Sequence, residues 1–352
     1  MATDSDGANI DLTSVRDAVR RQAQRATSGI DDMAGYLSEQ VADESHREVT
    51  GPLLAGTGAS GVVRHQGRVV AEWGDAAIPE MLFSGTKSVV ATVAGVAFDR
   101  GLLDPDAQVS RAVDHPLLTR LGIEGITWHH LLQQTSAWHG ELWGKPTEVD
   151  TQSRREGFER DGAPGSGWAY NDVRVNLLCL ALTVLFRRPL PEVLRAEVLE
   201  PLGASSSWSW HGYADSVVDI DGTATPVVSG GAHWGGGLWI SARDLALLGE
   251  LYRCRGEWRG RRLLSAEWID RSWSPCDLNA DYGYLWWRND SQRVQPDAPT
   301  SGRCARGNGG RHLLWIDPAR DLVIASHWGD EVRDLIAEIS AAVPPTSAAT
   351  PS

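Results

Sequence analysis

Phe83-Ser84-Gly85-Thr86-Lys87-Ser88 stands directly before the apolar run 89–98, which Arg100-Gly101 closes. This order predicts a helix with Ser84 in its first turn, because apolar runs of this length are typical of buried helices. A spacing of three residues places Ser84 and Lys87 one turn apart on the same face. The start of a helix also presents N–H groups and a partial positive charge that favour an oxyanion. A serine, a titratable amine and an anion-stabilising helix end are the components of an acyl-transfer site.

Lysine is almost absent from this chain. Of its 33 basic residues only Lys87 and Lys145 are lysines, and the other 31 are arginines. The guanidinium of Arg keeps its proton at any working pH, whereas a desolvated Lys amine can release it. Lys87 is therefore a candidate for proton transfer rather than for charge alone. Lys145 fits a residue at the rim of a substrate site and a solvated surface lysine about equally well.

Length and charge narrow the class of protein. The 352 residues carry a formal net charge of −13, which argues against nucleic acid or an anionic membrane as the main partner. Residues 1–9 lack the basic start and apolar core of a secretory signal, and no apolar run is long enough to span a membrane. The four cysteines show neither metal-ligand nor disulfide-framework spacing. These features predict a reduced, cytoplasmic protein and leave its oligomeric state open.

A second motif whose side chains are candidates for catalysis is Trp168-Ala169-Tyr170-Asn171-Asp172, which follows the loop Pro164-Gly165-Ser166-Gly167. Tyr170 stands just before a predicted helix, where its phenol can reach over Ser84. By itself the pattern favours a packed tyrosine followed by a helix cap at Asn171 or Asp172.

A third motif, Gly307-Asn308-Gly309-Gly310, precedes a predicted strand that begins near His312. Glycines at this point would let a substrate approach the strand backbone closely. A simple loop explains the same residues equally well.

Together and in this order, the three motifs resemble those of the serine β-lactamase-like family, which includes class C β-lactamases, DD-peptidases and related esterases, amidases and transacylases. The resemblance covers residues 52–330 and is closest to the branch of esterases and 6-aminohexanoate-dimer hydrolases. A bare Ser-x-x-Lys is a weak signal, but its conjunction with the other motifs in the correct order is a strong one. Supporting stretches lie at 61–67, 126–136, 232–239 and 241–246.

The resemblance implies a role for each matched residue. Ser84 is similar to the family's nucleophile, and Lys87 to the amine that activates it. Tyr170 matches the motif tyrosine, which exchanges protons with the nucleophile and the leaving group; the Lys87 ammonium would stabilise its phenolate. The oxyanion hole is implied to consist of the N–H of Ser84 and an N–H near Gly310. The resemblance implies neither a metal nor a cofactor.

Two positions depart from the family pattern. The Tyr-x-Asn box reads Tyr170-Asn171-Asp172, so a carboxylate stands at its third position, and Asn171 and Asp172 are both candidates for the substrate site. Asp172 can bind a substrate amine, hold Lys87 charged or cap a helix, and the sequence leaves all three open. The third motif also lacks the lysine that helps anchor the substrate carboxylate in penicillin-recognising members. Candidate substitutes are Arg306, Arg311 and His312.

Sixteen tryptophans are unusual for this length, and most are expected in the core. Several flank the motif loops and can form an aromatic wall for an acyl or heteroaromatic group. The substrate contacts proposed from this set are Trp138 and Trp234, and the other flanking residues are Trp143, Trp286 and Trp287. His129-His130 are expected to be structural, because adjacent histidines face different sides of a helix and no further ligand follows at metal spacing.

The predicted strands lie at both ends of the chain. We expect a hairpin at 60–73 around Gln66-Gly67, and strands at 284–287, 312–317 and 322–327. Helical periodicity or helix-start signals mark most of the intervening segments. The expected helices are two within 10–42, then 127–134, 171–187, 190–200, 241–253 and 330–342.

This arrangement predicts an α+β fold of the serine β-lactamase/DD-peptidase type, in which helices flank an antiparallel sheet formed from both chain ends. A mainly helical lobe at 101–229 is inserted into an α/β lobe at 10–100 and 230–342. Together they form one catalytic domain, 10–342, between disordered tails at 1–9 and 343–352. The cleft between the lobes is the expected ligand site.

The function predicted from these observations is a serine hydrolase that acts on a small-molecule ester or amide through a Ser84 acyl-enzyme. A transacylase that passes the acyl group to an amine in secondary metabolism is the close alternative. A β-lactamase or DD-peptidase ranks lower, because the secretory signal and the third-motif lysine are both missing. A non-catalytic member that binds a ligand remains open as well, although Ser84, Lys87 and Tyr170 are all present.

Overall fold

The computed structural model describes residues 10–39, 48–149 and 162–346. The predicted N-terminal tail 1–9 and residues 347–352 of the predicted C-terminal tail lie outside the described residues. At the start of the latter tail, Val343 is buried and the Thr346 N–H donates to the Ala319 carbonyl (2.8 Å). The chain is therefore still anchored at residue 346.

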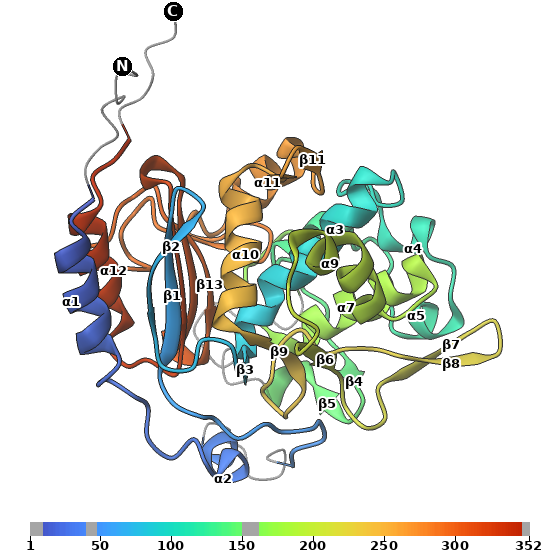
Figure 1. The fold of residues 1–352 in the computed structure, drawn as a ribbon. Coiled ribbons are helices and arrows are strands. Elements are labelled where there is room, and N and C mark those ends of the chain that lie inside the picture. The colour runs from blue at the N-terminus through green and yellow to red at the C-terminus, as the bar shows by residue number, and fades with distance from the viewer. Residues whose placement is uncertain (1–9, 40–47, 150–161, 347–352) are drawn as a thin grey trace, which may run out of the picture.

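A six-stranded antiparallel sheet joins the two ends of the chain, as the sequence predicts (Figure 1). Residues 60–73 supply two neighbouring strands, and residues 287–327 supply the other four. In their order across the sheet the strands are β12 (Trp287–Arg288), β13 (Arg303–Gly307), β14 (His312–Asp317), β15 (Leu322–His327), β1 (Ser60–His65) and β2 (Arg68–Trp73).

Two strands of this six-stranded sheet differ from the sequence-based expectation. The strand expected at 284–287 contributes only Trp287 to β12, because Leu285 has a φ of 58°, which is incompatible with an extended chain. The sequence does not predict β13, since Arg-Cys-Ala-Arg-Gly lacks the β-branched and aromatic residues that favour strands. Its neighbour β14 specifies the pairing instead.

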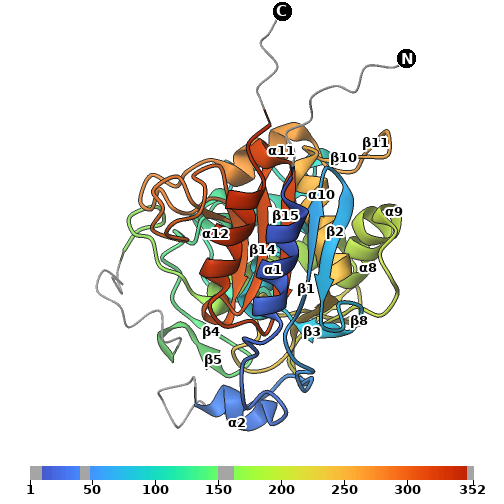
Figure 2. The ribbon, with the colours of Figure 1, turned by 60° about the vertical axis from the view of Figure 1, so that its left-hand side comes forward.

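Both faces of the sheet are covered. All six residues of β14 are buried, and they alternate between two cores: Leu313 and Trp315 pack toward α1 (Leu12–Gln22) and α12 (Val332–Ala342), whereas Leu314 and Ile316 pack toward the helical lobe. This alternation follows from the two-residue period of a strand. On the second face α10 (Ala242–Arg253) lies directly against the sheet, between it and the helical lobe (Figures 1 and 2).

Two apolar helices form the centre of the molecule. In α3 (Thr86–Asp99) every residue from 86 to 97 is buried, and α7 (Asp172–Phe186) is buried over most of its length. A helix that is apolar on all sides is expected to be surrounded by protein. Gly95 allows close packing, because a Cβ there would lie 2.4 Å from the indole of Trp268, whose N–H donates to the Ala91 carbonyl (3.0 Å).

Shorter helices surround this pair. They are α2 (Met33–Ser38), α4 (Val109–Ala112), α5 (Pro116–Arg120), α6 (Trp128–Leu132), α8 (Leu190–Leu194), a π-helical turn (Arg195–Leu199), α9 (Glu200–Leu202) and α11 (Ala266–Trp273). Of these, α2, α6, α8 and the π-helical turn fall within predicted ranges, whereas α4, α5 and α11 are not predicted. Among the described residues no helix has the length and apolar character needed to cross a membrane.

One small sheet joins strands that are far apart in the chain. This three-stranded sheet has the order β3 (Pro79–Met81), β9 (Gly237–Ser241) and β6 (Ser209–His211), and it leads the chain into α3. Three hairpins complete the described strands: β4 (Glu141–Leu142) with β5 (Lys145–Pro146), β7 (Val217–Ile220) with β8 (Thr223–Pro226), and β10 (Glu257–Trp258) with β11 (Arg261–Arg262).

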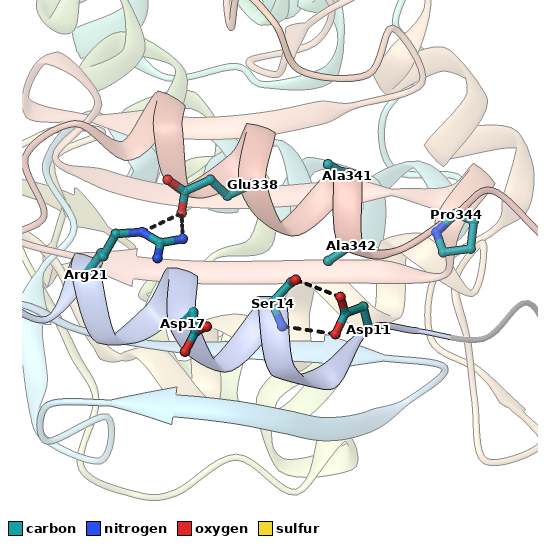
Figure 3. A pocket seen from close by; sticks show the side chains of 8 residues that line it. All are labelled: Asp11, Ser14, Asp17, Arg21, Glu338, Ala341, Ala342 and Pro344. Atoms are coloured by element: carbon teal, nitrogen blue, oxygen red, sulfur yellow. Dashed lines mark hydrogen bonds and ion pairs between the residues drawn. The ribbon is translucent and has the colours of Figure 1, made fainter.

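A groove of about 490 Å³ lies between α1 and α12 (Figure 3). The Arg21–Glu338 ion pair (2.8 Å) bridges the two helices there, and Asp11 caps α1 by accepting from Ser14. This groove is on the face of the sheet that α1 and α12 cover, opposite the face on which α10 lies.

Candidate active site

Ser84 lies in a 3-10 turn, Phe83–Gly85, directly before α3. Ser84 is half-buried, whereas Phe83 and Gly85 are fully buried. Phe83 has a φ of 52°, a conformation that costs free energy for a residue with a side chain and persists only when its surroundings fix it. The rings of His312 and Trp328 pack against Phe83, with centroids 5.0 and 5.4 Å away. Aromatic packing against Phe83 thus stabilises the turn that presents Ser84.

Lys87 points from the first turn of α3 to Ser84, as the three-residue spacing predicts. Its Nζ donates to Ser84 Oγ (2.8 Å) and to Asp172 Oδ1 (2.5 Å), and it lies 4.6 Å from the centroid of the Tyr170 ring. The side chain of Lys87 is only 1% exposed. The first and second motifs therefore meet at this ammonium group.

Asn171 and Asp172 do different things at the start of α7. Asn171 is the N-cap: its Oδ1 accepts from the Arg174 N–H (3.0 Å), and its Nδ2 donates to the Thr147 carbonyl (2.9 Å). Asp172, the first helical residue, turns to Lys87 instead. Of the three alternatives for Asp172, the geometry supports the pairing with Lys87. Asn171 is directed at the backbone rather than at Ser84.

The charge of Lys87 controls the ionisation of Asp172. Burial favours the neutral acid, but the Lys87 ammonium and then His233 outweigh it, so the pKa of Asp172 lies well below its ordinary value. The carboxylate is thus ionised at neutral pH and forms a buried ion pair with Lys87.

Tyr170 belongs to a cluster of four aromatic rings. Its ring is stacked on Trp287 (5.7 Å) and lies 6.1 Å from Tyr282 and 6.4 Å from Trp168. Burial raises the pKa of the Tyr170 phenol, and Lys87 only partly opposes that rise. The phenol therefore carries its proton in the resting site, in contrast to the phenolate that the resemblance implies.

The third motif approaches the Ser84 turn at Gly307, the last residue of β13. A Cβ at Gly307 would lie 2.2 Å from the Leu82 carbonyl oxygen and 3.2 Å from the Gly85 nitrogen, so only glycine fits there. Gly310, the position suggested by the sequence, lies beside the Arg306 guanidinium. It lines a cavity of about 380 Å³ whose lining residues do not include Ser84. The third motif therefore contacts the Ser84 turn through Gly307, three residues before the expected position, Gly310.

Comparisons with known proteins identify the family of this chain. The model of the Beta-lactamase family matches residues 47–330, which is most of the chain. The chain belongs to the Beta-lactamase family.

Individual relatives of this Beta-lactamase-family protein are distant. The 6-aminohexanoate-dimer hydrolase of Paenarthrobacter ureafaciens is 28% identical over 276 residues, which cover 71% of this chain and 66% of that protein. The chain thus matches just under two thirds of the length of this curated relative.

Solved structures show the same fold at low identity. A penicillin-binding protein homologue from Caulobacter crescentus has a TM-score of 0.60 at 18% identity and covers 97% of this chain and 100% of its own. EstCE1, described as a hydrolase with promiscuous acyltransferase activity, has a TM-score of 0.57 at 16% identity, with 94% and 99% covered. These matches confirm the predicted α+β β-lactamase-like fold, and the family is one of serine hydrolases.

Both tryptophans proposed as substrate contacts are core residues in this Beta-lactamase-family structure. Trp138 is 4% exposed and its Nε1 donates to the Leu121 carbonyl (2.7 Å), and Trp234 is fully buried beneath Lys145. Trp286 is fully buried too. The indoles that lie beside Tyr170 are instead those of Trp287 and Trp168, which are both half-buried. Trp168 was not among the tryptophans proposed from the sequence as an aromatic wall.

The three candidates for the missing third-motif lysine differ in availability. Arg311 is paired with Asp330 (2.9 Å), and His312 is fully buried against His327 (2.9 Å between the Nδ1 atoms). Arg306 has no carboxylate within ion-pair distance among the described residues, and its guanidinium lies 5.9 Å from the Trp287 ring. Of the three candidates, Arg306 is therefore the one whose charge remains available for a substrate carboxylate.

His233 is a site residue that the sequence reasoning missed. Its Nδ1 lies 3.7 Å from Asp172 Oδ2. The stretch 232–239 supports the family resemblance, but nothing in its pattern shows that His233 faces the second motif, which is about 60 residues away in the chain. Within the described ranges no three His, Cys, Asp or Glu side chains are grouped so as to hold a metal ion.

Proposed function

We propose that this protein is a serine hydrolase that cleaves a small-molecule ester or amide through an acyl-enzyme on Ser84. The observation that carries the proposal is the 2.8 Å contact between Lys87 Nζ and Ser84 Oγ, in a site where Lys87 is almost fully buried. A hydroxyl beside a buried amine is the arrangement by which serine is activated for attack. The name of the curated relative, a dimer hydrolase, supports hydrolysis as the reaction class.

The proton transfers follow from the contacts of Lys87. In its neutral form Lys87 takes the Ser84 proton as Oγ bonds to the acyl carbon, and Asp172 at 2.5 Å stabilises the ammonium that results. Tyr170, which retains its proton in the resting site, then donates it to the departing oxygen or nitrogen. Water attacks the acyl-enzyme in the second step, and the same groups return the protons.

Backbone N–H groups supply the oxyanion hole in this proposal. One donor is the N–H of Ser84, and the tight contact of Gly307 with Leu82 and Gly85 favours the backbone at 307–308 for the second, rather than Gly310. Donors fixed in a folded backbone need no reorganisation as charge develops on the oxygen.

Gly307→Ala tests this part of the site. The new Cβ would collide with the Leu82 carbonyl and push β13 away from the Ser84 turn. We expect the acylation rate to fall about 10²-fold or more, as for the loss of one oxyanion donor. The measurement is single-turnover acylation by an activated ester. Gly167→Ala, at a glycine with ordinary backbone φ and open space around its Cβ position, is the matched control; equal rates in the two variants would exclude a special role for Gly307.

The direct test of the proposal is a mass measurement. An activated short-chain ester should add one acyl group to the peptide that carries Ser84, and Ser84→Ala should remove the adduct. An adduct of the same stoichiometry in Ser84→Ala would refute the assignment. A protein that binds the ester without any adduct would be a ligand-binding member of the family.

Transfer of the acyl group to an amine is the second candidate, and the acyltransferase activity named for the structural neighbour EstCE1 favours it. If the protein is a transacylase, a suitable amine should speed turnover of the acyl-enzyme and divert the product from acid to amide. Mass spectrometry of the products with and without a panel of amines distinguishes the two. Free acid as the sole product throughout would support the hydrolase.

β-Lactams should be poor substrates. The third motif has no lysine for the substrate carboxylate, and of the three candidate substitutes Arg306 is the one that is neither buried nor paired with a described carboxylate. We expect a chromogenic cephalosporin to be hydrolysed at least about 10²-fold less efficiently than the best ester, since a lost charge-assisted contact and misplacement each reduce the rate by about tenfold or more. Comparable kcat/KM values for the two would contradict this.

A further inference from the structure

Asp172 faces two basic side chains rather than one. Its Oδ1 accepts from Lys87 Nζ at 2.5 Å, and its Oδ2 lies 3.7 Å from His233 Nδ1. A carboxylate between two potential cations divides its stabilisation between them, so that the protonation of one changes the proton affinity of the other. The resemblance offers no role for His233, because a carboxylate at position 172 is itself a departure from the family box.

The backbone closes over the ion pair next to His233. A Cβ at Gly231 would lie 2.4 Å from Asp172 Oδ2 and 3.2 Å from Lys87 Nζ. The segment that carries His233 is therefore in direct contact with both charges. Asp172 and Lys87 are almost fully buried, whereas the His233 side chain is 17% exposed, although its Nε2 atom is buried.

Among the residues that the structure describes, charged groups around His233 come from three elements. Lys87 belongs to α3, Asp172 to α7, and Lys145 on β5 lies over the ring of Trp234 (5.4 Å), which packs against His233 (5.0 Å). Position 145 keeps a basic side chain in every variant below, so its charge does not distinguish them. Asp172 is therefore the group through which a charge on His233 acts on Lys87.

We propose that His233 is a positioning residue that sets the protonation of Lys87 through Asp172. The effect on rate rests on the proposed function, but the contact itself does not. When His233 is protonated, Asp172 is partly neutralised and holds the Lys87 ammonium less tightly. A larger fraction of Lys87 is then neutral and able to accept the Ser84 proton. His233 thus keeps the site active on the acidic side of neutrality, where Lys87 alone would be protonated.

The sign of the effect gives a kinetic test. Acylation of Ser84 is compared in wild type and His233→Gln at pH 5.5 and pH 8.5. We expect the wild type to be about tenfold faster at the lower pH, the factor that corresponds to one pKa unit, and nearly equal at the higher pH, where His233 is neutral. In an Asp172→Asn background the His233→Gln change should have little effect at either pH.

The two lysines of the chain allow a test without catalysis. With ¹³C-labelled lysine, the spectrum contains one Cε signal from Lys87 and one from Lys145, and Lys145→Arg assigns them. The Lys87 signal should show a step where His233 titrates, below the titration of Lys87 itself, and His233→Gln should abolish the step. His211→Gln is the matched control, because His211 is also half-buried against an indole, that of Trp239 (4.3 Å).

The outcomes separate this inference from the proposed function. Loss of the step in His233→Gln but not in His211→Gln supports the inference, even if no acyl-enzyme forms on Ser84. An unchanged Lys87 titration in His233→Gln overturns it, even if Ser84 is acylated normally. Equal wild-type and His233→Gln rates at pH 5.5 would also overturn the kinetic role.

Discussion

Lys87→Arg should be nearly as damaging as Lys87→Ala, with a loss of about 10²–10⁴-fold in the rate of Ser84 acylation, the usual contribution of a general base. If Lys87 supplied only positive charge, Arg would preserve much of the function, and this chain uses Arg for 31 of its 33 basic residues. Arg cannot lose its proton, so it cannot accept the proton of Ser84. Its larger planar head also has no room where Nζ lies 2.8 Å from Ser84 Oγ and 2.5 Å from Asp172.

The measurement is the acylation rate of Lys87→Arg and Lys87→Ala by one activated ester, with thermal melting to verify the fold. Lys145→Arg is the matched control, because Lys145 is the other lysine and is also buried, with its Nζ donating to the Glu48 carbonyl (3.0 Å). Folded Lys145→Arg should acylate within a few-fold of wild type. A well-folded Lys87→Arg enzyme that does the same would make Lys87 an electrostatic anchor, and proton transfer would then belong to Tyr170.

The sequence predicts the local part of the site because local geometry depends on spacing. A helix fixes the relation between residues three apart, and Lys87 does reach Ser84. The sheet formed from both chain ends could also be predicted, because the strands at 60–73, 312–317 and 322–327 carry strong β patterns. β13 lacks such a pattern, and its position depends on pairing with β14.

The long-range contacts could not be predicted in the same way. Asp172 and Lys87 are 85 residues apart, and the same residue types are equally consistent with a helix cap or a substrate ligand. The choice between Gly307 and Gly310 depends on where a loop touches the Leu82 backbone, which no periodicity encodes. Trp138 and Trp168 both flank a motif, and only tertiary packing buries one and leaves the other beside Tyr170.

Asp172→Ala should destabilise the protein by about 3–5 kcal/mol, the usual cost of removing one partner from a buried ion pair. The side chains of Lys87 and Asp172 are 1% and 4% exposed, so the remaining ammonium would have neither water nor a carboxylate. With an unfolding entropy of roughly 2 cal/mol/K per residue, this corresponds to a fall in Tm of about 4–7 °C. Asp172→Asn is the control: its amide oxygen still accepts from Lys87, and we expect it to lose roughly half as much.

The pH dependence of this difference has a definite sign. Because the pKa of Asp172 is lower in the folded protein than in the unfolded chain, its contribution is complete above about pH 4 and is lost as the pH falls through the folded-state value. Wild type and Asp172→Ala should therefore differ in full at pH 7 and converge only in strong acid. Urea unfolding at several pH values measures the difference. If Asp172→Ala proved as stable as wild type at pH 7, Lys87 would be a neutral amine in the resting site, ready to act as a base without any help from His233.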